Sequence, residues 1–184
     1  MFLRDQGPTE IGGFGIAREG DPLLIEDVVL VRQFCTAVTV KFEDPAVADF
    51  FDEQIDLGRK PEQFARVWIH THPGDSAQPS LTDERTFGRV FGHCDWAVMA
   101  ILARGGEHSA RLRFNTGPKA DVVIRTRVDW SEPFGGSDQQ GWQAQYRASV
   151  TEDQVVLPLT GNGRRAIEDN LARWDQPDFA AAFW

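Results

Sequence analysis

Two histidines separated by one residue, His70 and His72, are the first candidates for chemistry in a chain of 184 residues that contains only four histidines. They belong to the segment ARVWIHTH, whose β-branched and aromatic residues predict a strand. Residues two apart in a strand point to the same face, so both imidazoles would lie on one side of a sheet, about 7 Å apart along the chain. This arrangement suits two ligands of one metal ion, although a His-x-His pair taken alone is more often two ordinary strand residues.

Asp83 could complete such a metal site. It lies eleven residues after His72, at the start of a predicted helix, beyond a loop marked by Pro73, Gly74 and Pro79 that lets the chain fold back toward the strand. Two His and one Asp with an open fourth position are typical of catalytic zinc, because structural zinc sites are closed by four protein ligands. Zinc lowers the pKa of water in the open position to about 7, and a nearby carboxylate can take up the proton that the water loses.

Ser80 and Asp83 also admit a purely structural interpretation. The segment SLTD matches the Ser-x-x-acid pattern of a helix start, in which both side chains cap the helix. Capping and catalysis do not exclude each other at these two residues. Glu10, considered alone, would be an ordinary acid at the edge of a strand.

The elements that must position these residues form a predicted α/β domain with a mixed sheet flanked by helices. Strands are predicted for EIGGFGIA, LLIEDVVLV, TAVTVKF, ARVWIHTH, WAVMAILA, ARLRFN and VVIRTRV. The first three follow one another along the chain, with a polar break at Arg32 and Gln33, and this order predicts a meander. Glycines weaken the first strand, which indicates that another backbone or a ligand approaches closely there.

Two helices are predicted between these strands. Residues 44–58 form the first, with Asp44 as its N-cap and an apolar stripe made of Val47, Phe50, Phe51 and Ile55. The segment LTDERTFGRVFG forms the second, which ends at its final glycine. After residue 130 the character of the sequence changes, and DQQGWQAQYRAS and GRRAIEDNLARW are compatible with further helices.

Together, Glu10 in EIGGFG, His70-Thr71-His72-Pro73, Ser80 and Asp83 resemble the signature of the JAMM (JAB/MPN-plus) metalloprotease family. That signature has an upstream Glu, then His-x-His, then a Ser and an Asp at fixed spacing. The resemblance covers approximately Glu10 to Val128, and HTHPGDSAQPSLTD looks most like prokaryotic JAB proteins thought to act beside ubiquitin-like proteins and their activating enzymes. It implies a single MPN/JAB-like domain of cytidine-deaminase-like architecture in residues 1–130, and we expect residues 131–184 to form a C-terminal extension packed on the core.

The same resemblance implies a mechanism. His70, His72 and Asp83 would bind one Zn²⁺, Glu10 would act as general base and then protonate the leaving amine, and Ser80 would donate a hydrogen bond to the oxyanion. The implied substrate is an isopeptide or peptide bond after the C-terminal tail of a ubiquitin-like modifier, and activating or conjugating enzymes of the same pathway would be further partners. Two alternatives stay open: a non-catalytic MPN scaffold, and a zinc hydrolase that acts on small peptides or on a sulfur-carrier adduct.

One departure from the family concerns the segment before Glu10. Family members usually carry a helix there, and the nine residues that precede Glu10 are too few for one of useful length. Either a C-terminal helix around Ile167 to Trp174 takes over that packing face, or this sequence does not contain the whole ancestral module.

Composition narrows the classes of partner. The net charge of −9 and the pI near 4.9 argue against nucleic acid, whose binders need a basic surface. The longest apolar run, WAVMAILA, is far short of a membrane span, so we expect no membrane partner and a cytoplasmic protein. Cys35 and Cys94 are expected to be buried thiols.

Charged residues cluster in two places. Residues 43–62 contain seven acidic and two basic residues, which favours a solvated helix face over the alternative of a surface that recognises a basic modifier. Four arginines repeat at period two on the last predicted strands and are expected to form a solvated basic face; they are Arg111, Arg113, Arg125 and Arg127.

Overall fold

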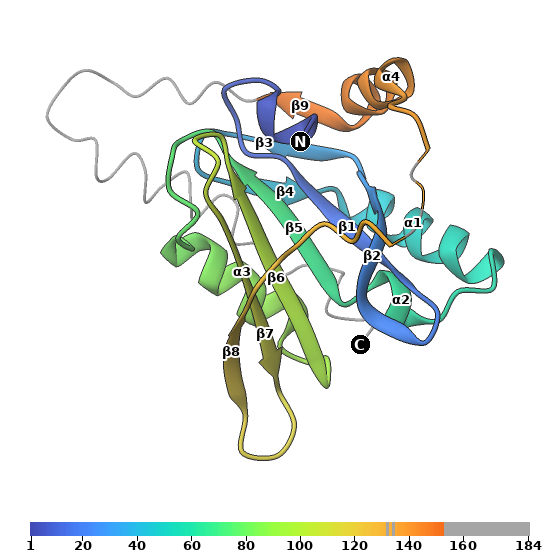
Figure 1. Ribbon diagram of the computed structural model, residues 1–184, viewed down its shortest axis with the longest axis vertical. Coiled ribbons are helices and arrows are strands. Elements are labelled where there is room, and N and C mark those ends of the chain that lie inside the picture. The colour runs from blue at the N-terminus through green and yellow to red at the C-terminus, as the bar shows by residue number, and fades with distance from the viewer. Residues whose placement is uncertain (132, 134, 153–184) are drawn as a thin grey trace, which may run out of the picture.

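The large sheet that carries the predicted strands is mixed and six-stranded, in the order β2-β1-β5-β6-β7-β8 (Figure 1). The computed structural model describes residues 1–131, 133 and 135–152. The strands are β1 (Gly12–Arg18), β2 (Asp21–Val29), β5 (Val67–His72), β6 (Trp96–Ala103), β7 (His108–Phe114) and β8 (Ala120–Ile124). Strands β5 and β6 are parallel, and the other neighbouring pairs are antiparallel. The mixed α/β fold predicted from the sequence is therefore confirmed.

A second, three-stranded sheet lies beside the start of β1. Its order is β4 (Val40–Phe42), β3 (Gln33–Cys35) and β9 (Val150–Glu152), with β3 antiparallel to β4 and parallel to β9. The predicted meander of the first three strands is wrong, because β1 and β2 form a hairpin in the large sheet whereas the third predicted strand contributes β4 to the small sheet. The predicted polar break falls between β2, which ends at Val29, and β3, which begins at Gln33. Val31, Gln33 and Cys35 are buried and alternate with exposed Arg32 and Phe34.

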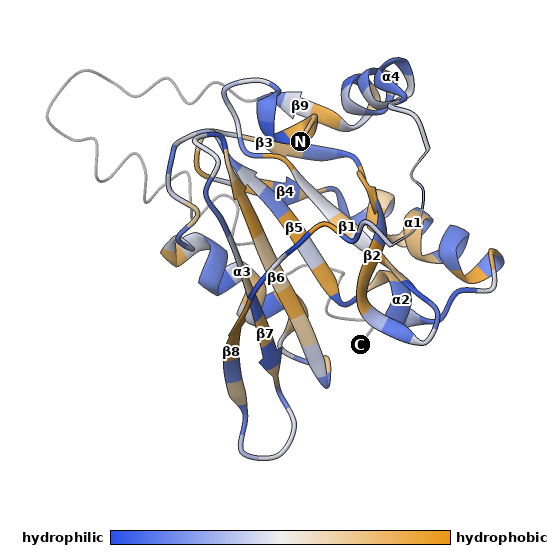
Figure 2. Ribbon diagram, in the orientation of Figure 1, coloured by the Kyte–Doolittle hydropathy of each residue, from blue (hydrophilic) through white to orange (hydrophobic). Residues whose placement is uncertain are grey.

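Three helices pack on one face of the large sheet. They are α1 (Asp44–Asp56), α2 (Pro61–Phe64) and α3 (Leu81–Phe91). Their side chains Phe50, Phe64 and Phe87 join Phe14 of β1 and Trp68 of β5 in one hydrophobic core, and each such aromatic side chain contributes about 1.5–3 kcal/mol on burial. Hydrophobic residues also run along much of β6 (Figure 2), as expected for a strand at the centre of a sheet.

The predicted helix at residues 44–58 is present, with two differences. Glu43 takes the N-cap position, so the helix begins at Asp44. Ile55 is 54% exposed, whereas Gln54 is buried and accepts a hydrogen bond from Arg59. Gln54 lies four residues after Phe50 and seven after Val47, so helical periodicity places it on the buried face and turns Ile55 toward solvent.

The prediction that Arg111 and Arg113 form a solvated face is wrong. Arg111 makes two bonds of 2.7 Å to Glu84 of α3, and Arg113 bonds to Asp121 at 2.8 Å. Both guanidinium groups lie over the ring of Phe87, at 5.7 and 4.7 Å from its centroid. Helix α3 covers this face of β7, so the two arginines pack against the helix. The other two arginines of the predicted face, Arg125 and Arg127, are exposed and lie beyond the end of β8.

Part of the chain after residue 131 packs beside the N-terminus. Helix α4 (Gln139–Ser149) brings Trp142 to within 5.8 Å of the ring of Phe2, and Tyr146 donates a hydrogen bond to Glu152 of β9. Within the described residues 1–10, the 3₁₀ turn at Leu3–Asp5 is the helical element that precedes Glu10. The helix predicted around residues 167–174 lies outside the described residues, and the domain boundary at residue 130 stays a prediction.

The described part of the chain contains no helix with the length and hydropathy that a bilayer-spanning segment requires.

Candidate metal centre

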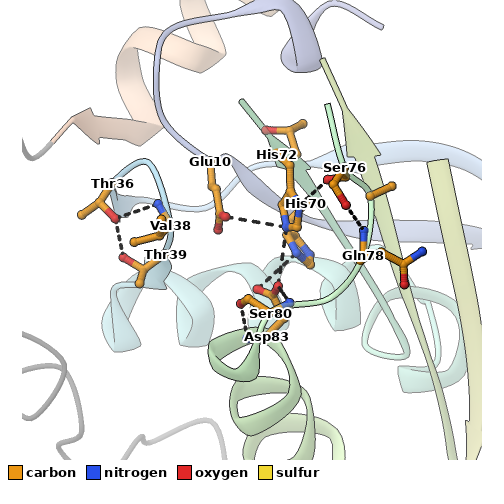
Figure 3. Close-up of polar contacts among 12 residues, drawn as sticks. Glu10, Thr36, Val38, Thr39, His70, His72, Ser76, Gln78, Ser80 and Asp83 are labelled. Carbon is orange, nitrogen blue, oxygen red and sulfur yellow. Dashed lines mark hydrogen bonds and ion pairs between the residues drawn. The ribbon is translucent and has the colours of Figure 1, made fainter. Parts of the chain in front are cut away.

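The two histidines and Asp83 lie at the crossover from β5 to β6. His70 and His72 lie on the helix-facing side of β5, where His70 stacks on Trp68 with ring centroids 4.2 Å apart. Because β5 and β6 are parallel, the connecting helix α3 starts near the carboxyl end of β5. Its first turn carries Asp83, and this topology brings the three residues together (Figure 3).

Glu10 approaches the same point from the segment before β1 (Figure 3). Nε2 of His70 lies 3.3 Å from Oδ1 of Asp83, and Nε2 of His72 lies 3.5 Å from Oδ2 of Asp83 and 3.6 Å from Oε1 of Glu10. One nitrogen or oxygen from each of His70, His72 and Asp83 lies within 4.8 Å of the other two. The structure thus brings together all three predicted metal ligands and the predicted general base.

Hydrogen bonding prepares His72 to bind a cation. Its Nδ1 lies 2.9 Å from the backbone carbonyl of Ser76, which can accept a hydrogen bond but cannot donate one. Nδ1 therefore carries the proton, and the lone pair of Nε2 points toward Asp83 and Glu10. The loop that supplies this carbonyl is fixed at Ala77, where Ser109 donates to the carbonyl at 2.6 Å and Glu107 accepts from the N–H at 3.3 Å.

Ser80 and Asp83 form the capping box that the sequence suggests. Oγ of Ser80 accepts from the Asp83 N–H at 3.1 Å, and Oδ2 of Asp83 accepts from the Ser80 N–H at 2.6 Å. Ser80 is exposed at the surface, whereas Asp83 is buried. Because Oγ acts as an acceptor in the cap, the hydroxyl proton of Ser80 is still available to another acceptor.

Burial and mutual charge set the protonation states in this cluster. Burial lowers the pKa of His70 below its ordinary value, which keeps the imidazole neutral. The pKa of His72 is raised, mainly by the Asp83 carboxylate and to a smaller extent by the Ser76 carbonyl and Glu10. Although burial opposes its ionisation, the two histidines hold the pKa of Asp83 well below its usual range. Burial, assisted by the negative charge of Asp83, raises the pKa of Glu10 to about 8.

The donor set fits a metal ion. Both ring nitrogens of His70, Nε2 of His72 and Oε2 of Glu10 are buried and make no hydrogen bond within the described residues, and such groups normally have a partner. Two donor atoms bound to one tetrahedral zinc ion lie about 3.4 Å from each other. The separations of 3.3 and 3.5 Å from Asp83 to the two histidines agree with that value. Neutral imidazole and ionised carboxylate are also the forms that bind metals.

Two residues that support this cluster were not predicted from the sequence. The Ser76 carbonyl orients His72, and no property of the side chain at that position could have revealed the role. The second residue is Gln33, which contacts the start of β1. The alternation of Val31, Gln33 and Cys35 in the sequence could have revealed it, since this pattern places a polar residue on a buried face. Cys35 and Cys94 are free and buried, as expected.

The fold and the site define an α/β domain with a candidate mononuclear metal centre at a strand–helix crossover. A family model described as prokaryotic homologs of the JAB domain matches residues 2–115. The chain therefore belongs to this family of JAB-domain homologs, and the matched residues include Glu10, His70, His72, Ser80 and Asp83. A comparison with curated proteins found no match to the chain.

Proposed function

We propose that the protein is a zinc-dependent peptidase or isopeptidase of the JAMM type, which cleaves after the C-terminal tail of a ubiquitin-like modifier. The observation that carries this proposal is the convergence of the His70, His72 and Asp83 ligand atoms on a buried point beside Glu10, in a chain of the JAB family. A scaffold without activity would not need this complete donor set. The free thiols of Cys35 and Cys94 are compatible with a cytoplasmic site of action.

His70, His72 and Asp83 would hold the metal. When bound, zinc supplies a Lewis acid that acidifies water and polarises the scissile carbonyl. Glu10 lies at the rim of the donor set, and its Oε2 has no hydrogen-bond partner among the described residues. In its ionised form, the Glu10 carboxylate can accept the proton that the attacking water loses and deliver it to the leaving amine.

Ser80 is suited to bind the negative charge that develops on the carbonyl oxygen. Ser80 is an exposed residue at the N-cap of α3, and the cap leaves its hydroxyl proton free to be donated. A donor of this kind, held in place before the reaction, stabilises an oxyanion without the cost of reorganising solvent. The helix cap therefore also fixes the orientation of the catalytic hydroxyl.

The acidic residues of helix α1 would attract a modifier that has a basic surface. Asp52, Glu53 and Asp56 are exposed, while Asp49 lies 3.6 Å from Arg32. Exposed acidic residues on one helix accelerate the association of a partner of opposite charge. We therefore assign α1 to the initial encounter with the modifier and its conjugates.

The direct test is cleavage of a ubiquitin-like protein fused through its C-terminal tail to a reporter peptide. We expect the purified, zinc-loaded chain to cut at the junction, to lose this activity with a metal chelator and to regain it when zinc is added back. Fusions of several ubiquitin-like proteins should be compared with short peptides of the same tail sequence. Cleavage of the short peptides alone would favour a small-peptide hydrolase over modifier removal.

A further inference from the structure

The start of β1, next to Glu10, lacks a neighbouring strand on one side. Strand β2 pairs with β1 only from Phe14, which faces Val29. On the other side, Gly12 faces His70 of β5. The N–H and carbonyl of Gly12 therefore extend beyond the end of β2, at a position where buried backbone groups require other partners.

The side chain of Gln33 supplies those partners. Its Oε1 accepts from the Gly12 N–H at 2.8 Å, and its Nε2 donates to the Gly12 carbonyl at 2.8 Å. Nε2 also donates to the Val31 carbonyl at 2.9 Å, and Cys35 Sγ donates to Oε1 at 3.3 Å. Gln33 is 1% exposed, so all four hydrogen bonds of its carboxamide are made inside the protein.

The contact between the two sheets is tight at this point. A Cβ on Gly12 would lie 2.8 Å from Cγ1 of Val40 and 3.0 Å from the ring of Phe42, so only glycine allows β1 to approach the small sheet this closely. Two residues earlier, the Glu10 N–H donates to the carbonyl of Thr36 at 2.8 Å. Residues 10–12 are thus held by the β3–β4 hairpin and the turn that joins its strands.

We propose that Gln33 is a positioning residue for Glu10 in the reaction assigned under Proposed function. The Gln33 carboxamide fixes the backbone of Gly12, which follows Glu10 by two residues and faces His70 across the sheet, and it thereby sets the distance from the Glu10 carboxylate to the ligand set. The four hydrogen bonds of the Gln33 carboxamide go to Gly12, Val31 and Cys35, and none involves a predicted metal ligand. Its loss should therefore impair the chemical step while metal binding and substrate binding are preserved.

The test compares Gln33→Met with Gln54→Met. Methionine has a similar length but cannot make these hydrogen bonds. Gln54 of α1 is also buried, at 3% exposed, and accepts a hydrogen bond from Arg59, which follows the end of α1. Gln54 therefore matches Gln33 in residue type and burial but not in location. We expect kcat to fall by about 10- to 10²-fold in Gln33→Met, with KM and zinc content unchanged, because small misplacements of a catalytic group have effects of this size. Gln54→Met should keep the wild-type kcat.

A second measurement does not depend on activity. Amide hydrogen exchange of a peptide that covers residues 10–12 should become faster in Gln33→Met and stay unchanged in Gln54→Met. If Gln33→Met does not fold, Gln33→Glu replaces it, since it keeps an oxygen for the Gly12 N–H and loses the donor to the Gly12 carbonyl.

Equal losses of kcat in the Gln33 and Gln54 variants, or unchanged exchange at residues 10–12, would overturn the positioning role. Absence of cleavage by the zinc-loaded wild type would instead overturn the proposed function, and the exchange measurement would then decide whether Gln33 holds residues 10–12.

Discussion

Ser80 and Asp83 bond to each other's backbone N–H groups, and this exchange leaves Oδ1 of Asp83 turned toward His70. The cap uses Oδ2 of Asp83, at 2.6 Å from the Ser80 N–H, whereas Oδ1 lies 3.3 Å from Nε2 of His70. Helix capping thus orients the carboxylate toward the candidate metal site. The same cap holds the Ser80 hydroxyl against the backbone of Asp83 (Figure 3), so a single helix start would serve two steps of the proposed reaction.

The ligand assignment predicts the metal content of five variants. The wild type should bind one zinc ion per chain, and His70→Ala, His72→Ala and Asp83→Ala should each lose most of it, because each removes a ligand. His93→Ala and His108→Ala are matched controls at exposed histidines and should keep full occupancy. Elemental analysis after gel filtration measures the result, and full metal content in all three ligand variants would refute the assignment.

The raised pKa of Glu10 predicts how the stability of the metal-free protein depends on pH. The native state keeps the Glu10 proton up to about pH 8, whereas the unfolded chain releases it near 4.5. The native state therefore binds more protons between these values, and its stability falls as the pH rises through this window.

Glu10→Gln should remove this contribution. The variant should match the metal-free wild type near pH 4.5 and exceed its stability by on the order of 3 kcal/mol at pH 7. Denaturant unfolding of both proteins across this pH range gives the comparison. A constant difference between them would show that Glu10 titrates normally.

Ser80→Ala should separate oxyanion binding from capping. Loss of the cap should cost about 1 kcal/mol of stability, and loss of the hydrogen bond to the oxyanion should lower kcat by about 10²- to 10³-fold. Ser80→Thr keeps the hydroxyl and the cap, so it should retain much of the activity and the stability. A Ser80→Ala protein with reduced stability but normal kcat would restrict Ser80 to its capping role.

The site was easier to predict than the fold around it. Local rules place His70 and His72 on one strand face and Ser80 and Asp83 at a helix start, whereas their joint assignment to one site, together with Glu10, came from the resemblance to the JAMM family. The small sheet was not predictable, since β3 and β4 are three residues each and β3 also pairs with β9, more than a hundred residues away. The pairing of Arg111 with Glu84 likewise depends on which face of β7 is covered by α3, which the charge pattern does not reveal.

The role assigned to helix α1 predicts slower association without loss of metal. Asp52→Lys combined with Asp56→Lys should reduce the association rate of a basic modifier and weaken its dependence on salt. The matched control reverses Glu19 and Asp27, which are also exposed but lie on or next to the β1–β2 hairpin. Stopped-flow binding with the metal-loaded proteins measures both rates. Equal rates in the two double variants would indicate that α1 is only a solvated face.

Turnover of Glu10→Gln at equal zinc content tests the central claim most directly. The substitution keeps the size of the side chain and leaves His70, His72 and Asp83 in place, but glutamine cannot take up a proton from water. We expect zinc content and KM close to those of the wild type and a kcat lower by about 10²- to 10⁴-fold on the same ubiquitin-like fusion. Cleavage by Glu10→Gln at the wild-type rate would contradict a mechanism in which this cluster activates water.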